Sequence, residues 1–455
     1  MNRIARRAFV VLLLVLVLIG GLSFFTAEFC TKAGDWVLFS GSPHVYNRGK
    51  IANGFVTDRN GTALAAMTGD KAFSSDAQVR KAMLHWLGDR EGNVSTPALT
   101  EYSLEMTGFN LADGLYRYGN SGYKATLALS SAVQVAAMEA LGDRHGTVAV
   151  YNYKTGELLC AVSTPTFDPD NVPQITEEDY AFDGIYVNRF TQSTYTPGSV
   201  FKLITAAAAL ETVPDITERT FVCYGEYDYG DDAVTCEGAH YEQTLKEALA
   251  NSCNCVFAQI VELVGQETLE KYVEKYQLTQ PVSFDGITTA QGHFDLTGAG
   301  IIEVAWSGIG QYTDLINPCR FLTFIGDVAA GGSGAVPYVV SQIQVGDNVT
   351  YQAKTKLDTA KVEKTTAQTL KEYMRNNVET VYGADSFPGL NVCAKSGTAE
   401  VGGDRRPNAV FAGFVDDPNY PLAFIAVVEN AGYGSTVCVP ILSQVLSVCK
   451  AELDR

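Results

Sequence analysis

The 455-residue sequence lacks several features that mark common classes of protein. Basic residues are not in excess, because 33 Lys and Arg stand against 51 Asp and Glu, for a net charge of −18. So acidic a chain repels phosphate backbones, which argues against nucleic acid as a partner. There is no internal repeat and no low-complexity linker, and a hydrophobic content of 46% argues against disorder. The length suffices for about two to three domains.

Cysteine spacing gives no metal or redox motif. None of the ten cysteines forms a C-x-x-C pair, and Cys253 and Cys255 are too close together for the usual zinc spacing. The best disulfide candidate joins Cys223 to Cys236, which bracket a hairpin-like segment rich in Gly, Asp and Tyr. The alternative is a set of buried thiols that behave as small hydrophobic side chains. Both interpretations stay open at this point.

The N-terminus predicts a membrane anchor. Residues 8–27 carry no charge and are rich in Val and Leu. At about 1.5 Å per residue, a helix of this length spans a bilayer core of about 30 Å. Three arginines precede the run, so the positive-inside rule predicts a single pass with a cytoplasmic tail at 1–7 and the rest of the chain outside the cell membrane. The alternative is a cleaved signal peptide, but the run is long for one and no clean cleavage site follows it.

Hydrophobic periodicity beyond the anchor predicts a short N-terminal module at 28–123 and a larger domain at 124–455. Strands at both ends of the larger domain and helices between them predict an α+β fold, with a central antiparallel sheet of about five strands flanked by helices. The expected helices cover 77–87, 131–141, 199–210, much of 245–276 and a stretch from Pro440 to about Leu453. The expected hairpins cover 147–163 and 410–429.

An S-x-x-K motif at 199–202 opens one of these helices. Residues three apart share a helix face, so the Lys202 amine can lie beside the Ser199 hydroxyl. A serine hydroxyl becomes a good nucleophile when a neighbouring base takes its proton, and a lysine serves if its pKa is lowered. The motif alone is weak, because two further copies exist, Ser121/Lys124 and Ser447/Lys450.

Two further motifs make the prediction specific. Ser252-Cys253-Asn254 is the only S-x-N, and it lies between two helical runs, although a pair of helix caps is the simpler interpretation of those residues. The K-[ST]-G motif at 395–397 precedes the second hairpin, so we expect it on an edge strand. A second copy, at 154–156, reads as a hairpin turn. The three motifs in this order are the signature of serine penicillin-recognising enzymes.

The sequence resembles the class B penicillin-binding proteins, the monofunctional transpeptidases, over most of its length. Besides the three motifs, family-like segments lie at 48–51 (R-G-x-I), 58–61 (D-R-N-G), 163–169 (S-x-P-x-F-D-P) and 308–311 (G-x-G-Q). The N-terminal module is short for this group. Residues 408–411 read N-A-V-F where the family often has H-A-W-F.

The resemblance implies a peptidoglycan D,D-transpeptidase that is inhibited by β-lactams. The implied catalytic residues are the nucleophile Ser199, the base Lys202, the proton relay Ser252, the amide-binding Asn254 and the cationic Lys395. The implied substrate-binding residues are Ser396, Gly397 and Thr398, and the N–H groups of Ser199 and Thr398 form an oxyanion hole. Neither a metal nor an organic cofactor is implied. The expected partners are stem peptides, β-lactams and other membrane proteins of cell-wall synthesis.

Two other functions remain as alternatives. One is a β-lactamase or D,D-carboxypeptidase on the same fold. Class A lactamases deacylate with a glutamate that positions water, but residues 280–301 contain Asp285 and Asp295 and no glutamate. The other is a non-catalytic β-lactam sensor or scaffold. The complete motif set counts against it, as does a predicted cytoplasmic tail of only 1–7.

Overall fold

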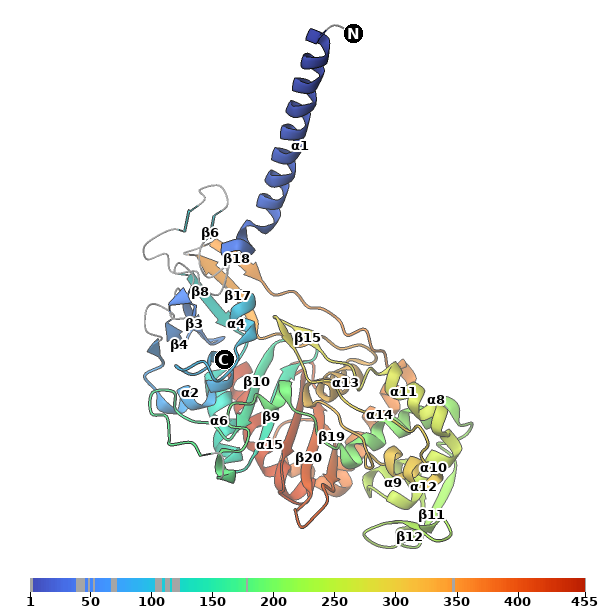
Figure 1. Ribbon diagram of the computed structural model, residues 1–455. Helices are drawn as coiled ribbons and strands as arrows, with labels where there is room; N and C mark the ends of the chain where they lie inside the picture. The colour runs from blue at the N-terminus through green and yellow to red at the C-terminus, as the bar shows by residue number, and fades with distance from the viewer. Residues whose placement is uncertain are drawn as a thin grey trace.

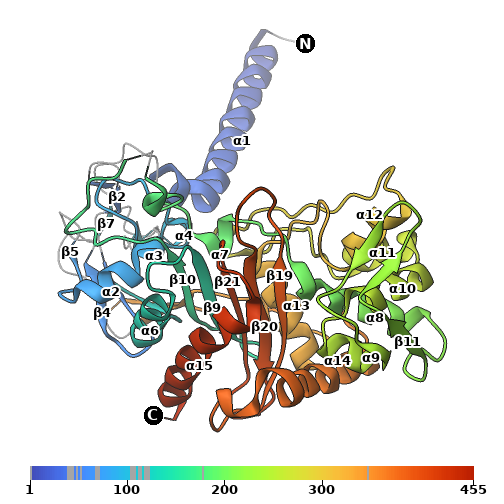
Figure 2. The same ribbon diagram turned by 90° about the horizontal axis from the view of Figure 1, so that it is seen from below.

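The computed structural model describes residues 3–37, 46–47, 50–51, 54–66, 72–102, 109–110, 115–116, 123–176, 179–345 and 348–454. A long helix, α1 (Arg3–Val37), leads away from the body of the protein (Figure 1). Seen from below, the body has a small N-terminal part, a central sheet and a helical part, side by side (Figure 2).

Helix α1 contains the predicted anchor and extends beyond it at both ends. Residues 3–33 are long and apolar enough to cross a membrane, and the large side chains from Phe9 to Phe25 are exposed. Helix α15 (Gly434–Leu453) passes the same length and composition test, but its apolar face packs against the central sheet. The N-terminal apolar helix therefore fits a single-pass membrane anchor.

The central sheet has five antiparallel strands in the order β10-β9-β21-β20-β19, which confirms the predicted sheet. Both predicted hairpins are present, and the K-[ST]-G motif lies on the edge strand β19, as expected. Every strand is largely buried, because helices cover both faces of the sheet. The strands are β9 (Gly146–Asn152), β10 (Leu158–Thr164), β19 (Val392–Ala399), β20 (Asn408–Val415) and β21 (Leu422–Val428).

One face of this sheet packs on α6 (Ser131–Leu141) and α15, and the other on α13 (Pro318–Ala330). Helix α6 has the predicted bounds. Helix α15 begins at Gly434, so the prediction that it starts at Pro440 is wrong. Gly434 lies so close to the backbone of Gly397 that a Cβ would collide with it, and this close packing fixes the start of the helix against β19.

A second sheet, of six strands, joins the N-terminal part to the larger domain. Its order is β18-β17-β8-β3-β4-β5, so β17 and β18, from the middle of the predicted larger domain, extend a sheet begun by the N-terminal module. The division at 123/124 stays a prediction. The strands are β3 (Phe55–Thr57), β4 (Ala63–Ala66), β5 (Ala72–Phe73), β8 (Tyr123–Leu127), β17 (Val340–Val345) and β18 (Asn348–Gln352).

The helix predicted over 77–87 is broken at Met83 into α2 (Ala77–Ala82) and α3 (Leu84–Leu87). Three further short elements are α4 (Pro97–Glu101), the strand pair β1 (Tyr46–Asn47) and β2 (Lys50–Ile51), and the pair β6 (Phe109–Asn110) and β7 (Leu115–Tyr116). Arg48 and Gly49 of the R-G-x-I segment and Ser121 of one S-x-x-K copy lie outside the described residues.

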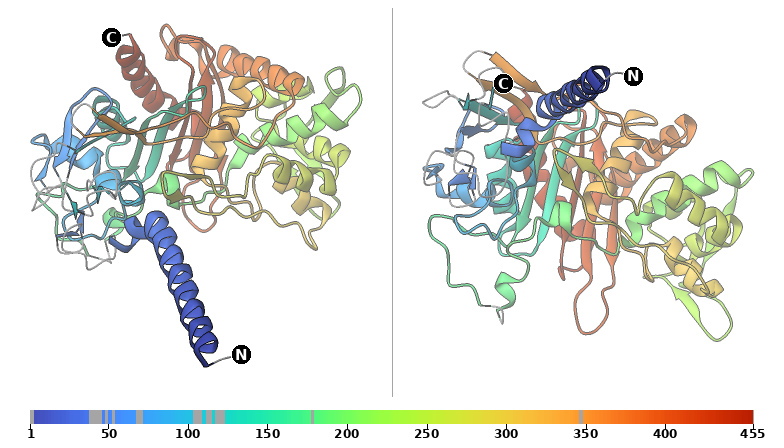
Figure 3. Two further views of the ribbon diagram at one scale, coloured as in Figure 1. Left: turned by 90° about the horizontal axis from the view of Figure 1, so that it is seen from above. Right: turned by 45° about the horizontal axis from the view of Figure 1, so that its top comes forward.

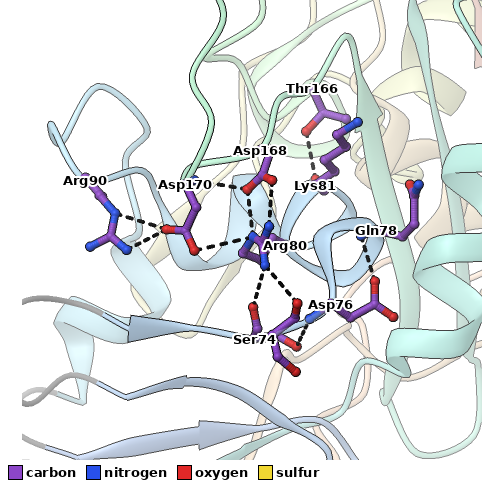
Figure 4. A network of polar contacts seen from close by, with 10 residues as sticks. Ser74, Asp76, Gln78, Arg80, Lys81, Arg90, Thr166, Asp168 and Asp170 are labelled. Carbon is purple, nitrogen blue, oxygen red and sulfur yellow. Dashed lines mark hydrogen bonds and ion pairs between the residues drawn. The ribbon is translucent and has the colours of Figure 1, made fainter.

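A polar network fastens α2 to the loop that follows β10 (Figure 4). Arg80 donates from Nε and Nη2 to the two carboxylate oxygens of Asp168, each at 2.7 Å. The Arg80 guanidinium lowers the pKa of Asp168. Thr166 Oγ1 donates to the Lys81 carbonyl at 2.7 Å. The family-like segment at 163–169 therefore binds the two parts of the molecule together.

The helical part lies beyond the β19 edge of the central sheet (Figure 3). Its helices are α8 (Lys202–Thr212), α9 (Leu245–Ala250), α10 (Asn254–Val264), α11 (Gln266–Lys275), α12 (Ile301–Gly308) and α14 (Lys364–Asn377). The shorter elements are η1 (Tyr180–Phe182), α7 (Arg189–Gln192), η2 (Gly198–Phe201), β15 (Ser283–Phe284), β16 (Ile287–Thr288), η3 (Val378–Tyr382) and η4 (Ala384–Ser386).

Two small ribbons extend the helical part: β11 (Thr220–Cys223) pairs with β14 (Tyr241–Thr244), and β12 (Glu226–Asp228) pairs with β13 (Ala233–Thr235). The Cys223–Cys236 disulfide is absent, because both residues are free thiols. The ribbons instead direct both sulfur atoms at His240 Nδ1, at 3.7 Å and 3.5 Å.

Candidate active site

The three predicted motifs meet at the β19 edge of the central sheet. Ser199 lies in η2, the 3₁₀ turn that leads into α8. Ser252 and Asn254 occupy the turn between α9 and α10, and Lys395 lies on β19. Turn, helix and edge strand thus contribute one motif each, as the sequence predicts.

Ser252 lies between two buried lysines. Lys202 Nζ donates to the Ser252 carbonyl at 2.6 Å and to Asn254 Oδ1 at 2.7 Å, and lies 3.4 Å from Ser252 Oγ. Lys395 Nζ donates to the same Oγ at 2.9 Å and to the Ser396 carbonyl at 2.8 Å. Ser252 adopts a φ of 53°, a strained conformation for a residue with a side chain, which the surrounding contacts hold in place.

Burial perturbs both lysines. It lowers the pKa of Lys202 to about 8. The pKa of Lys395 is lowered well below its usual range, first by burial and then by the charge of Lys202. The repulsion between the two amines therefore acts on Lys395, whereas burial is the main cause of the shift at Lys202. An amine whose pKa is near neutrality can accept a proton.

Close backbone contacts place the Ser199 turn against β19. A Cβ on Gly397 would lie 2.8 Å from the Pro197 carbonyl, and a Cβ on Gly198 would lie 2.6 Å from the Thr398 carbonyl. Gly198 also has a φ of 58°, which favours glycine. Only glycine at these positions allows the two segments to approach this closely.

The family-like segment at 308–311 also packs against the Ser199 turn. Gly198 N–H donates to the Gly310 carbonyl at 2.8 Å. A Cβ on Gly310 would collide with the Gly198 carbonyl. Gln311 Nε2 donates to the Thr398 carbonyl at 3.4 Å, so this segment contacts both η2 and β19.

The family model for the penicillin-binding protein transpeptidase domain matches residues 146–447, which include all of these groups. The chain belongs to this family. It is 30% identical over 328 residues to Stage V sporulation protein D of Bacillus subtilis, which covers 68% of this chain and 49% of that protein. It is 26% identical over 363 residues to the peptidoglycan D,D-transpeptidase PbpA of Mycolicibacterium smegmatis, covering 72% and 71% of the two chains.

Solved structures share the fold. Penicillin-binding protein A of Mycobacterium tuberculosis superposes with a TM-score of 0.76 at 22% identity, covering 88% of this chain and 99% of that one. The D,D-transpeptidase domain of a peptidoglycan glycosyltransferase from Eggerthella lenta gives a TM-score of 0.74 at 23% identity, covering 87% and 97%. The likeness therefore extends well beyond the motifs.

The other hydroxyls of the K-[ST]-G segment have partners that the sequence did not reveal. The phenol oxygen of Tyr382, in η3, accepts from Ser396 N–H and shares a hydrogen bond with Ser396 Oγ, both at 2.9 Å. Thr398 Oγ1 accepts from Gly434 N–H at 3.3 Å. No motif marks Tyr382, because it reaches β19 only through the packing of η3 on the sheet.

The described residues of the duplicate motifs, and the aspartates of the 280–301 segment, lie outside this site. Lys154 is in the β9–β10 turn, and Lys450 pairs with Asp454 on the surface of α15. Asp285 accepts from Val339 N–H at 2.6 Å, and Asp295 caps its own turn. Within the described part of the chain, no carboxylate hydrogen-bonds to Lys202, Ser252 or Lys395.

Proposed function

We propose that this chain is a membrane-anchored peptidoglycan D,D-transpeptidase that uses Ser199 to attack the D-Ala-D-Ala end of a stem peptide. The observation that carries the proposal is the pair of buried lysines on Ser252, together with the packing of the Ser199 turn against β19, the strand that carries Lys395. Family membership and the named D,D-transpeptidases among its relatives support the same reaction.

Acylation proceeds as follows. Ser199 Oγ attacks the carbonyl carbon between the two D-alanines and loses its proton to the neutral amine of Lys202. The backbone N–H groups of Ser199 and Thr398 stabilise the oxyanion, each contributing about 3–4 kcal/mol, the value found in well-studied hydrolases. The C–N bond then breaks, and the terminal D-Ala leaves as an amine with a proton that Ser252 relays from the lysines.

In the second step, the amine of another stem peptide attacks the Ser199 ester. The new amide is the cross-link, and the proton of the amine returns Ser199 to a hydroxyl. A β-lactam follows only the first step, because its leaving group stays tethered in the adduct. The absence of a carboxylate partner for Lys202, Ser252 and Lys395 among the described residues supports slow hydrolysis of that adduct.

Substrate binding falls to Asn254 and to residues 396–398. Asn254 holds the amide of the stem peptide next to Lys202, to which its Oδ1 already bonds. The Ser396 and Thr398 hydroxyls, with Gly397 between them, bind the terminal carboxylate near the charge of Lys395. Tyr382 holds Ser396 in position by its two hydrogen bonds.

We place the catalytic domain outside the membrane, with α1 as its single-pass anchor. The arginines that precede the apolar run support this orientation. In this position the enzyme stays beside polymeric peptidoglycan, where acceptor amines are at high local concentration. Other membrane proteins of cell-wall synthesis are its expected partners.

A donor–acceptor assay tests the proposal. Full-length protein in detergent is incubated with a stem pentapeptide ending in D-Ala-D-Ala and a labelled amine acceptor. We expect release of D-Ala and a cross-linked product, both lost in Ser199→Ala and kept in Ser447→Ala, which removes the serine of a duplicate motif. Release of D-Ala without transfer would instead identify a carboxypeptidase.

A further inference from the structure

We propose that Cys223, Cys236, His240 and Cys253 form a tetrahedral zinc site that fixes the S-x-N turn of the active site. The four ligand atoms lie within 4.8 Å of one another. They come from the end of β11, the residue after β13, the residue before β14 and the centre of the S-x-N motif. Three thiolates and one imidazole are a common ligand set for structural zinc.

The distances match the edges of a zinc tetrahedron. Zn–S and Zn–N bonds of about 2.3 Å and 2.0–2.1 Å place neighbouring sulfur atoms about 3.8 Å apart, and sulfur and nitrogen about 3.6 Å apart. Cys236 Sγ lies 3.9 Å from Cys253 Sγ and 3.5 Å from His240 Nδ1. Cys223 Sγ lies 3.7 Å from the same Nδ1. A disulfide would need sulfur atoms about 2.05 Å apart.

Burial also fits a structural metal. Cys223 and Cys253 are fully buried, whereas Cys236 and His240 are only partly so. The ligands therefore enclose the centre from the inside and leave an entry path on the outer side. When Zn²⁺ binds, the three thiols release their protons to solvent and three S–Zn bonds form.

A bound zinc ion would stabilise the two ribbons, β11–β14 and β12–β13. Each has only two strands, and an isolated two-stranded ribbon is marginally stable in water. Most residues of β12 and β14 are exposed or partly exposed. The β11–β14 register pairs Cys223 with Tyr241 and so brings His240 beside Cys223, while Cys236 N–H donates to the Gly225 carbonyl at 2.8 Å. The ribbons alone thus preorganise three of the four ligands.

The fourth ligand, Cys253, links the proposed zinc site to the active site. Cys253 stands between Ser252 and Asn254, the two residues that contact the lysines. Asn254 Nδ2 donates to the Thr235 carbonyl at 2.9 Å, so the turn already rests on the same ribbon. Zinc bound to Cys253 holds Ser252 in its strained conformation and sets the position of its hydroxyl between the lysines.

Metal content of the full-length protein in detergent is the first test. We expect about one zinc per chain, lost in Cys236→Ser and His240→Ala but kept in His240→Cys, which retains four ligands. Cys319→Ser, which removes a buried thiol of α13 outside the cluster, serves as the matched control and keeps the zinc.

Cobalt substitution guards against variants that fail to fold. Wild-type protein stripped by a chelator is titrated with Co²⁺, and we expect the thiolate charge-transfer and strong d–d absorption of a tetrahedral cobalt–sulfur centre at one equivalent. Removal of zinc should slow penicillin acylation of Ser199 on the order of 100-fold, the cost of misplacing a catalytic group by about 1 Å, and added Zn²⁺ should restore it.

Three results would overturn the site. They are wild-type protein without stoichiometric zinc that also fails to bind Co²⁺, a zinc content unchanged in Cys236→Ser and His240→Ala, and an intact mass showing that these cysteines form disulfides. Because metal content and absorption are read without a substrate, they can fail even if the proposed transpeptidase activity is correct.

Discussion

Two clusters of side chains share the S-x-N turn at 252–254, and they differ in the chemistry of their members. The lysine cluster, Lys202 and Lys395 on Ser252, has two fully buried amines with no carboxylate partner among the described residues. The cysteine–histidine cluster brings together three sulfur atoms and one imidazole nitrogen, a ligand set suited to Zn²⁺. Burial disfavours the charged form of the two amines and so suits the first cluster to proton transfer, whereas the second cluster is suited to holding the turn rigid. Ser252 and Asn254 belong to one cluster, and Cys253 belongs to the other.

The largest effect should come from the lysine cluster. Lys202→Met removes the base while keeping most of the side-chain volume, so we expect the rate of penicillin acylation to fall by about 100- to 10,000-fold. Thermal stability should be kept or raised, since a buried amine with a lowered pKa disfavours the folded state. Stopped-flow acylation and thermal melts measure both. A fall in Tm as large as that of a zinc-ligand variant such as Cys236→Ser would show that Lys202 also has a structural role, and would contradict the proposed difference between the two clusters.

A backbone change should have the next largest effect. Gly397→Ala places a Cβ 2.8 Å from the Pro197 carbonyl and must push β19 away from the Ser199 turn. We expect acylation to slow on the order of 100-fold, because a shift of about 1 Å at the reacting groups has that cost. Gly20→Ala, in α1 with open space around it, is the control. Equal acylation by the two variants would show that the close contact is dispensable.

The pH dependence should be smaller. Lys202 must be neutral to accept the Ser199 proton, and its pKa is about 8. The acylation rate of the wild type should therefore rise through neutral pH and level off above about pH 8 to 9. Replacing zinc by Co²⁺ should leave this profile in place, because the cysteine–histidine cluster does not donate or accept the proton. A rate that is independent of pH across this range would exclude Lys202 as the base.

The smallest effect should lie outside both clusters. Asp168→Asn removes the charge that pairs with Arg80, so we expect a modest fall in Tm at neutral pH with normal acylation. The pKa of Asp168 is lowered in the folded state, so its stabilisation is present at neutral pH and is lost as pH falls through that pKa. The Tm difference between variant and wild type should therefore shrink in acid. A difference that persists would point to packing rather than charge.

The two clusters also differ in how far the sequence predicts them. The lysine cluster could be predicted because each motif is short and its order is specific. The central sheet could be predicted because its strands are long, apolar and joined by clear turns. The cysteine–histidine cluster could not be predicted, because its ligands come together only through the β11–β14 register and no pair has zinc-finger spacing. For the same reason the sequence could not decide between a Cys223–Cys236 disulfide and free thiols, and the structure has free thiols.

Long-range pairing hid two other features. Strand β17 pairs with β8 although the whole stretch 128–339 lies between them in the sequence, so the six-stranded sheet has no local signal. Tyr382 meets Ser396 only because η3 packs beside β19. Pro440 suggested a helix start, but α15 begins at Gly434, which packs against the backbone of Gly397 on a distant strand.

Ser199 is proposed to form a long-lived acyl-enzyme with penicillin. Full-length protein is treated with penicillin, freed of excess drug and followed by intact mass, with peptide mapping of the modified residue. We expect one penicilloyl group per chain, located on Ser199, persisting for minutes or longer and absent from Ser199→Ala. An adduct that survives in Ser199→Ala, or one that disappears within seconds while excess penicillin is steadily hydrolysed, would contradict it.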